Sequence, residues 1–136
     1  NNKKKINSKK GKYFSNSQNF IFVDSVTVAS KDYNIITDNM HYNSNSEITY
    51  FFGPSYIISK NEKIYCENGW HNTKTKISQF QNNAYITTKQ YLLKGDSLYY
   101  NKSLGYAKAI KNVELIDTIE NITVFGGFES ILKKKK

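Results

Sequence analysis

The feature of this sequence that most constrains its fold is an internal repeat of 29 residues. Three segments, DNMHYN, ENGWHN and DSLYYN, begin at Asp38, Glu67 and Asp96, and each opens with an acid and closes with Asn. A repeat of this length holds two strands and their turns at about 3.3 Å per extended residue. One copy cannot bury its apolar face alone, so neighbouring copies must stack. The period therefore predicts a solenoid-like β-structure.

Alternation within each repeat predicts which side chains face the interior. Phe20, Phe22, Val26 and Val28 share one parity, and later repeats follow the same pattern. Alternate residues of a strand point to opposite faces, so one parity lines one face. Three columns of repeat-equivalent residues result: Phe22, Phe51, Phe80 and Ala109; Val28, Ile57, Ile86 and Leu115; and Ile35, Ile64, Leu93 and Ile122. These columns either fill a solid core, the usual role of apolar stripes, or line a slot completed by a ligand.

The remaining local signals agree with a nearly all-β chain. Polar segments that start at Asn43, Asn72 and Asn101 carry turn-forming residues between the expected strands. No segment shows a helical period with caps at both ends. A chain of 136 residues is long enough for one domain, so we expect residues 1–136 to form a single domain with basic, frayed tails at 1–12 and 133–136.

The net charge of +9 is concentrated at the two ends of the chain. Such lysine runs are either solvated tails or a means of attracting an anionic partner. Binding of nucleic acid through lysine and stacked tyrosine is the third-ranked function, because the lysines do not form a stripe along the aromatic strands. We therefore expect no nucleic-acid partner.

The N-terminal residues, NNKKKINSKKGKYF, lack the apolar segment of a secretory signal. Because the chain does not begin with Met, we expect that a signal preceded it and was removed. No apolar run approaches the roughly 18 residues needed to cross a membrane. The lone cysteine, Cys66, is expected to be a small buried hydrophobe.

No pattern in the sequence indicates catalysis, a metal or a cofactor. His41 and His71 are 30 residues apart, one off the repeat, and are interpreted as surface or turn residues. The acids Asp38, Glu67 and Asp96 recur in register, which favours a structural role, since a catalytic carboxylate pair needs unequal surroundings. Nucleophile and phosphate-loop motifs are absent. We expect a protein that is not an enzyme.

Two stretches of the chain resemble a known family. GDSLYYN, from Gly95, followed by GYAKAIKNVELID resembles the OstA-like domain of lipopolysaccharide transport, with Lys111-Asn112-Val113 at the family's "GNV" step. TYFFGPSYIISKNEKIYCENGW is similar to the Bacteroidetes form of this domain. The resemblance spans roughly Phe20 to Phe128. Gly53-Pro54 departs from it, because the family often has Gly-Asn there, and Pro restricts strand pairing to an edge or a bend.

The resemblance implies a repetitive antiparallel β-jellyroll with an apolar slot between two sheets, open along one side. It implies a bridge protein that shields the acyl chains of lipid A during transfer of lipopolysaccharide to the outer membrane. The implied location is the periplasm, with association with the outer membrane as the alternative. It implies strand pairing at the sheet edge with other jellyroll domains of the bridge or with further copies of the chain, end to end. The residues expected to contact acyl chains are Phe22, Val28, Ile35, Phe51, Ile57, Ile64, Phe80, Ile86, Leu93 and Leu115.

The main alternative is a structural or adhesive surface β-solenoid that binds glycan or protein through exposed Tyr, Asn and Lys. That reading predicts an interior closed by the protein's own side chains. A lipid carrier predicts an interior with an opening along the coil.

Overall fold

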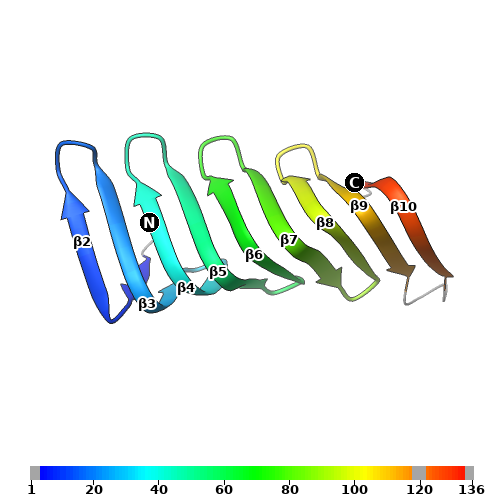
Figure 1. The fold of residues 1–136 in the computed structure, drawn as a ribbon, viewed down its shortest axis with the longest axis horizontal. Coiled ribbons are helices and arrows are strands. Elements are labelled where there is room, and N and C mark those ends of the chain that lie inside the picture. Colours follow the sequence, from blue (N-terminus) through cyan, green and yellow to red (C-terminus); the bar gives the residue numbers. More distant parts are fainter. Residues whose placement is uncertain (1–3, 118–121, 134–136) are drawn as a thin grey trace.

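The computed structural model describes the backbone of residues 4–117 and 122–133 and the side chains of residues 4–117. These residues form one antiparallel sheet in which strands β3 to β10 follow one another in chain order, while β1 and β2 both pair with β3 (Figure 1). The described residues contain no helix that could span a membrane. The strands are β1 (Lys5–Asn7), β2 (Lys10–Phe14), β3 (Asn19–Ala29), β4 (Tyr33–Asn43), β5 (Ile48–Ser59), β6 (Glu62–Asn72), β7 (Ile77–Thr88), β8 (Tyr91–Asn101), β9 (Tyr106–Asp117) and β10 (Ile122–Lys133).

A two-residue bulge interrupts every second strand, at intervals of 29 residues. The bulged pairs are Asp24-Ser25 in β3, Gly53-Pro54 in β5, Asn82-Asn83 in β7 and Lys111-Asn112 in β9. Except for Pro54, each of these residues has a positive φ. Bulges bend a strand and increase its twist, so the sheet curls along this line. The expectation that Gly53-Pro54 marks a bend is confirmed.

The recurring acids lie opposite the bulges. Between Phe52↔Asn68 and Ser55↔Cys66, the two bulge residues of β5 face the single residue Glu67 of β6. Glu67 also accepts a hydrogen bond from the Asn83 amide at 3.2 Å, and Asp96 accepts one from Asn112 at 3.0 Å. These carboxylates therefore hold bulge residues in a conformation that L-residues otherwise avoid.

The turns repeat as regularly as the bulges. Asn43 Oδ1 accepts hydrogen bonds from the backbone N–H groups of residues 45 and 46, and Asn72 Oδ1 does the same for residues 74 and 75. Adjacent turns are joined by backbone hydrogen bonds of 3.0 Å, such as Lys102 N–H to Lys76 O. The turns at 15–18, 44–47, 73–76 and 102–105 thus stack along one edge of the sheet (Figure 1).

The bulges divide the sheet into two layers that face each other across an apolar interior. The first layer comprises the strand halves next to the stacked turns, and the second comprises the halves beyond the bulges. In the first layer, Cα partners form the row Phe22, Met40, Phe51, Gly69, Phe80, Leu98 and Ala109. In the second layer they form the row Val28, Ile35, Ile57, Ile64, Ile86, Leu93 and Leu115. The second and third predicted columns are therefore alternate members of one row.

Two details differ from the sequence-based expectations. The partner of Leu115 across β9 and β10 is Val124, and Ile122 instead pairs with Asp117, so Ile122 does not continue its predicted column. The 1–12 segment includes β1 and part of β2, which pair with β3, so residues 5–7 and 10–12 are ordered strand rather than a frayed tail. At the other end Lys133 belongs to β10, and residues 134–136 lie outside the described residues.

Candidate functional site

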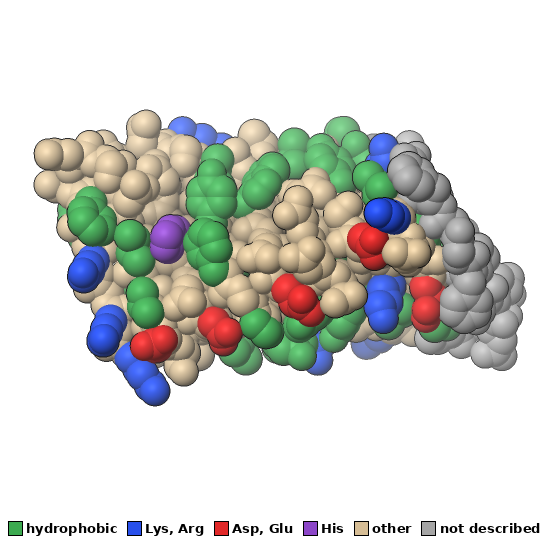
Figure 2. Space-filling view, in the orientation of Figure 1, with side chains coloured by type: hydrophobic (Ala, Val, Ile, Leu, Met, Phe, Trp, Pro, Cys, Tyr) green, Lys and Arg blue, Asp and Glu red, His purple; other side chains and the backbone are tan. Residues whose placement is uncertain are grey.

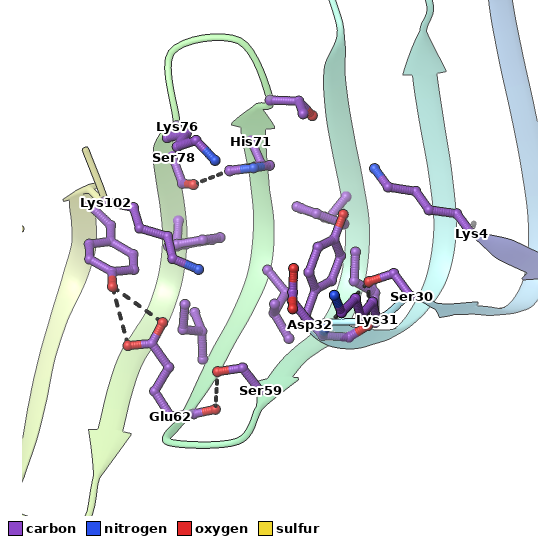
Figure 3. Close-up of a pocket in the computed structure, with 18 residues that line it drawn as sticks. Lys4, Ser30, Lys31, Asp32, Ser59, Glu62, His71, Lys76, Ser78 and Lys102 are labelled. Atoms are coloured by element: carbon purple, nitrogen blue, oxygen red, sulfur yellow. Dashed lines mark hydrogen bonds between the residues drawn. The ribbon is translucent and has the colours of Figure 1, made fainter. Parts of the chain in front are cut away.

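A cavity of about 210 Å³ lies between the two layers and is the candidate site (Figure 3). Its floor is apolar, with side chains from four strands: Ile35, Phe51, Ile57, Ile64 and Phe80. A second cavity of about 120 Å³ adjoins it and shares Lys4, Tyr33 and Ile35 with it. The two cavities together form a slot that continues toward the N-terminal edge of the sheet.

The structure places every predicted contact residue on the inner face, in three different settings. Ile35, Phe51, Ile57, Ile64 and Phe80 line the main cavity, and Val28 lines the second one. Ile86 and Leu93 are fully buried and line neither cavity. Phe22 and Leu115 are partly buried and pack against the core. The interior is thus solid around Ile86 and Leu93 and hollow from β7 toward the N-terminal edge of the sheet.

The crease between the layers holds small and polar residues. Thr37 and Ser55 are buried and their hydroxyls share a 2.7 Å hydrogen bond, and the Ser55 hydroxyl lies 2.8 Å from the Gly53 carbonyl oxygen. Cys66, beside them on β6, is a buried free thiol whose pKa is raised to about 12, mainly by burial. The expectation of a small buried hydrophobe is confirmed. The described residues contain no group of three or more potential metal ligands.

The first layer presents a row of residues at the mouth of the slot that is polar from Tyr42 to Tyr100. Its Cα partners run Phe20, Tyr42, Thr49, His71, Ser78, Tyr100 and Ala107. A hydrogen bond across the mouth joins the layers: the Tyr100 hydroxyl on β8 lies 3.2 Å from both carboxylate oxygens of Glu62, at the start of β6 (Figure 3). Burial, and then the Glu62 carboxylate, raise the pKa of Tyr100, so its hydroxyl stays protonated and donates.

His71 lines the cavity, so the interpretation of it as a surface or turn residue is wrong. Its Nδ1 lies 2.6 Å from the Ser78 hydroxyl oxygen. The 29-residue period aligns His71 with Tyr42 and Tyr100, both inward-facing, and this alignment within the sequence could have placed it correctly.

Burial, and to a smaller degree the ammonium groups of Lys4, Lys102 and Lys76, together lower the pKa of His71 to about 4. The imidazole is therefore neutral at pH 7. Because the pKa in the folded protein lies below the unfolded value of about 6.5, the unfolded chain binds the proton more tightly. The stability that neutral His71 provides is complete above pH 6.5 and is lost as pH falls toward 4.

We predict that this loss is measurable as a difference between the wild type and His71→Gln. Urea unfolding at pH 7.0 and 4.5 should show the wild type losing about 2 kcal/mol more than the variant, at about 1.4 kcal/mol for each unit of pKa difference. Glutamine keeps a hydrogen-bonding group beside Ser78 but does not titrate. Because both proteins carry the same carboxylates, the loss of stability due to carboxylate protonation cancels in the comparison. Equal losses would show that His71 is not held neutral by its surroundings.

Comparisons with known proteins connect this geometry to a family and a fold. Residues 1–38 and 35–96 match the profile described as OstA-like protein. The crystal structure of LptH, described as the LptA homologous periplasmic component of the conserved lipopolysaccharide transport device from Pseudomonas aeruginosa, matches with a TM-score of 0.72 and 11% sequence identity. The match covers 98% of this chain and 96% of that chain, and confirms the β-jellyroll expected from the sequence. No curated protein matched the sequence.

Proposed function

The chain belongs to the OstA-like protein family, as its motifs predicted, and from this premise we propose that it is a module of a lipopolysaccharide-transport bridge. In this role the slot shields acyl chains of lipid A while the sugars remain in water. The observation that carries the proposal is a cavity with an apolar floor and a polar, lysine-bearing rim. The rim residues Lys4, Lys31, Lys76 and Lys102 are exposed.

The physical basis of cargo binding is burial of hydrocarbon. Each CH₂ group that moves from water into the slot gains about 0.8 kcal/mol, and the aliphatic row offers this gain without polar contacts. Sites for small molecules usually have volumes of roughly 300–1,000 Å³, whereas the main cavity holds about 210 Å³. A lipid with several acyl chains therefore requires the layers to part, which breaks the hydrogen bond between Tyr100 and Glu62.

The edges of the sheet support the proposed partners. β10 pairs with β9 on one side only within the described sheet, and the short strands β1 and β2 form the opposite edge. An edge strand recruits another strand through its unpaired backbone groups. We propose that these edges pair with other jellyroll domains of the bridge or with further copies of this chain, in the periplasm or at the outer membrane.

Direct binding of lipid A tests the proposed function. The protein is incubated with lipid A, and the complex is detected by native mass spectrometry and by the shift of the thermal unfolding midpoint. At a lipid concentration of 100 times Kd, a ligand bound only to the folded state stabilises it by about 2.7 kcal/mol. The matched control is the same saccharide after removal of its acyl chains, which should give neither a complex nor a shift. Equal binding of both forms, or binding of neither, contradicts the proposal.

The features that favour the adhesive-solenoid alternative lie on the outer surface. Figure 2 shows apolar side chains distributed among polar ones on one outer face, and Tyr56, Tyr65 and Tyr85 form a ladder with ring centroids 5.0 and 5.4 Å apart. That alternative predicts a closed interior, and the cavity favours the carrier. Binding of the deacylated saccharide as tightly as lipid A would favour the alternative instead.

A further inference from the structure

Three lysines from distant parts of the chain converge on the mouth of the slot. Lys4 precedes β1, Lys76 ends the turn at 73–76, and Lys102 begins the turn at 102–105. All three line the main cavity, and Figure 3 shows Lys76 and Lys102 pointing into it from one side and Lys4 from the other. The slot is thus apolar at its floor and cationic at its rim.

The positive charge at this rim is not balanced by nearby acids. Among residues 4–117, the salt bridge found is Lys74 with Glu47, and none of the three converging lysines forms one. The acids that line the cavity are Asp32 and Glu62, against four lysines, and the Glu62 carboxylate already accepts from Tyr100. An anion at the rim would be attracted by the ammonium groups of these lysines.

The backbone fixes two of these lysines as neighbours. The Lys102 N–H donates to the Lys76 carbonyl at 3.0 Å, and Lys76 N–H donates to the Asn72 carbonyl at 2.8 Å. Both side chains therefore start from a rigid, hydrogen-bonded pair of turns. Two lysine side chains that leave such a pair of turns can reach one anion together, and the positive charge of both then favours its binding.

A neutral donor lies beside the lysines. The His71–Ser78 hydrogen bond leaves one polar hydrogen available to a ligand in either tautomer of His71. When Ser78 donates to Nδ1, the available donor is the imidazole Nε2–H. When His71 donates through Nδ1–H, it is the Ser78 O–H. The Lys4, Lys76 and Lys102 ammonium groups are close enough to this imidazole to depress its pKa. Ammonium groups and an additional N–H or O–H donor are the usual partners of phosphate oxygens.

The fold does not require these residue types. The period aligns Lys76 with Gln18, Glu47 and Gly105, and aligns Lys102 with Ser15, Ser44 and Thr73. The same turn forms in each case, so Lys76 and Lys102 are departures from the repeat at one place along the stack. His71, in place of Tyr42 and Tyr100, is a third departure at that place.

We propose that Lys4, Lys76 and Lys102, with the His71–Ser78 pair, form a subsite for the phosphate ester of a lipid headgroup. The subsite rests on the proposed function, because it places the phosphate at the rim while the acyl chains of the same molecule occupy the apolar floor. Lysine binds phosphate as a point charge, so the subsite selects for anionic headgroups and does not discriminate between the sugars that carry the phosphate. Free phosphate has the same chemistry, and the test separates the two sources.

The test compares two lipids that differ only in the phosphate. Dioctanoyl phosphatidic acid and dioctanoyl glycerol carry the same acyl chains, and each is titrated against the full chain in a fluorescent fatty-acid displacement assay. We expect the wild type to bind the phosphatidic acid about tenfold more tightly, with the preference shrinking as salt screens the charges. In K76Q/K102Q the preference should fall to near unity, with diacylglycerol binding unchanged. The control variant K63Q/K94Q loses the same charge from exposed positions on the outer face and should keep the preference.

Each outcome has a distinct meaning. Equal affinity of the wild type for the two lipids, or an equal preference in both double variants, overturns the subsite and leaves the acyl-chain carrier intact. Binding of neither lipid overturns the proposed function, and the subsite with it. Inorganic phosphate that binds the wild type through Lys76 and Lys102 without competing with phosphatidic acid identifies a free-anion site and overturns the headgroup assignment.

Discussion

Replacing Ile57 with aspartate is expected to weaken binding of acylated lipid about 30-fold or more and to leave the protein folded. Ile57 lines the main cavity and is only partly buried, between its Cα partners Ile35 and Ile64. A carboxylate there would have to lose water when an acyl chain enters, at a cost of about 2 kcal/mol or more, and each 1.4 kcal/mol is tenfold in affinity. The measurement is the dissociation constant for lipid A, with the urea midpoint as the check on folding.

The matched control is the same substitution one residue later. Ile58 points to the outer face, is 36% exposed and pairs with Asn34 and Lys63. Ile58→Asp should therefore bind lipid as the wild type does. Because a new carboxylate at 57 could also attract the rim lysines, the neutral pair Ile57→Asn and Ile58→Asn repeats the comparison without charge. Equal lipid affinity in the 57 and 58 variants would place the acyl chains elsewhere.

Ile57 differs from its repeat equivalents Val28 and Ile86 in being only partly buried, which the sequence pattern alone did not reveal. Ile86 belongs to the same predicted column as Ile57, Phe51 belongs to another predicted column, and each of the two is 1% exposed. An aspartate at either site would leave an unpaired charge in the core, and the protein would lose stability together with any binding. A variant that unfolds cannot distinguish a lipid site from a core position, whereas Ile57 at the edge of the cavity can.

The period predicted the fold well because every repeat forms the same strands, bulge and turn. Strand positions, turn positions and the inward parity all follow from a 29-residue spacing, and the Cα pairs Ile35↔Ile57 and Ile64↔Ile86 join the predicted columns into one row. The register fails at β10, where Val124 takes the place expected of Ile122 opposite Leu115. The lysine-rich β1 and β2 were missed because edge strands carry charged, exposed side chains that read as a tail.

The candidate site was harder to predict because it is made by contacts between layers. A period relates residues along a layer but carries no information on which side chain faces which across the slot. The hydrogen bond between Glu62 and Tyr100 joins residues 38 positions apart, which is not a multiple of the repeat. The convergence of Lys4 with Lys76 and Lys102 has the same origin, since Lys4 enters from outside the repeated region.

Replacing Phe80 with alanine is expected to lower the free energy of unfolding by about 3–5 kcal/mol, the usual cost of removing a buried phenyl ring. Phe80 is 1% exposed, and its ring lies against the backbone of β6 at Gly69, where an added Cβ would come within 3.2 Å of the ring and 2.6 Å of the Gln79 carbonyl oxygen. The measurement is urea unfolding. Phe52→Ala is the control: Phe52 is 39% exposed on the outer face beside His41, so its loss should cost about 1 kcal/mol or less.

The Phe80→Ala variant also tests whether a bound acyl chain lies against the floor of the slot. Phe80 also lines the main cavity, so its removal enlarges the apolar floor on which an acyl chain could lie. A bound acyl chain should then restore part of the lost stability, and saturating lipid should raise the free energy of unfolding more in Phe80→Ala than in the wild type. Phe52→Ala should gain no more than the wild type. If lipid stabilised all three proteins equally, the acyl chain would not lie against Phe80, and the slot floor would be core rather than site.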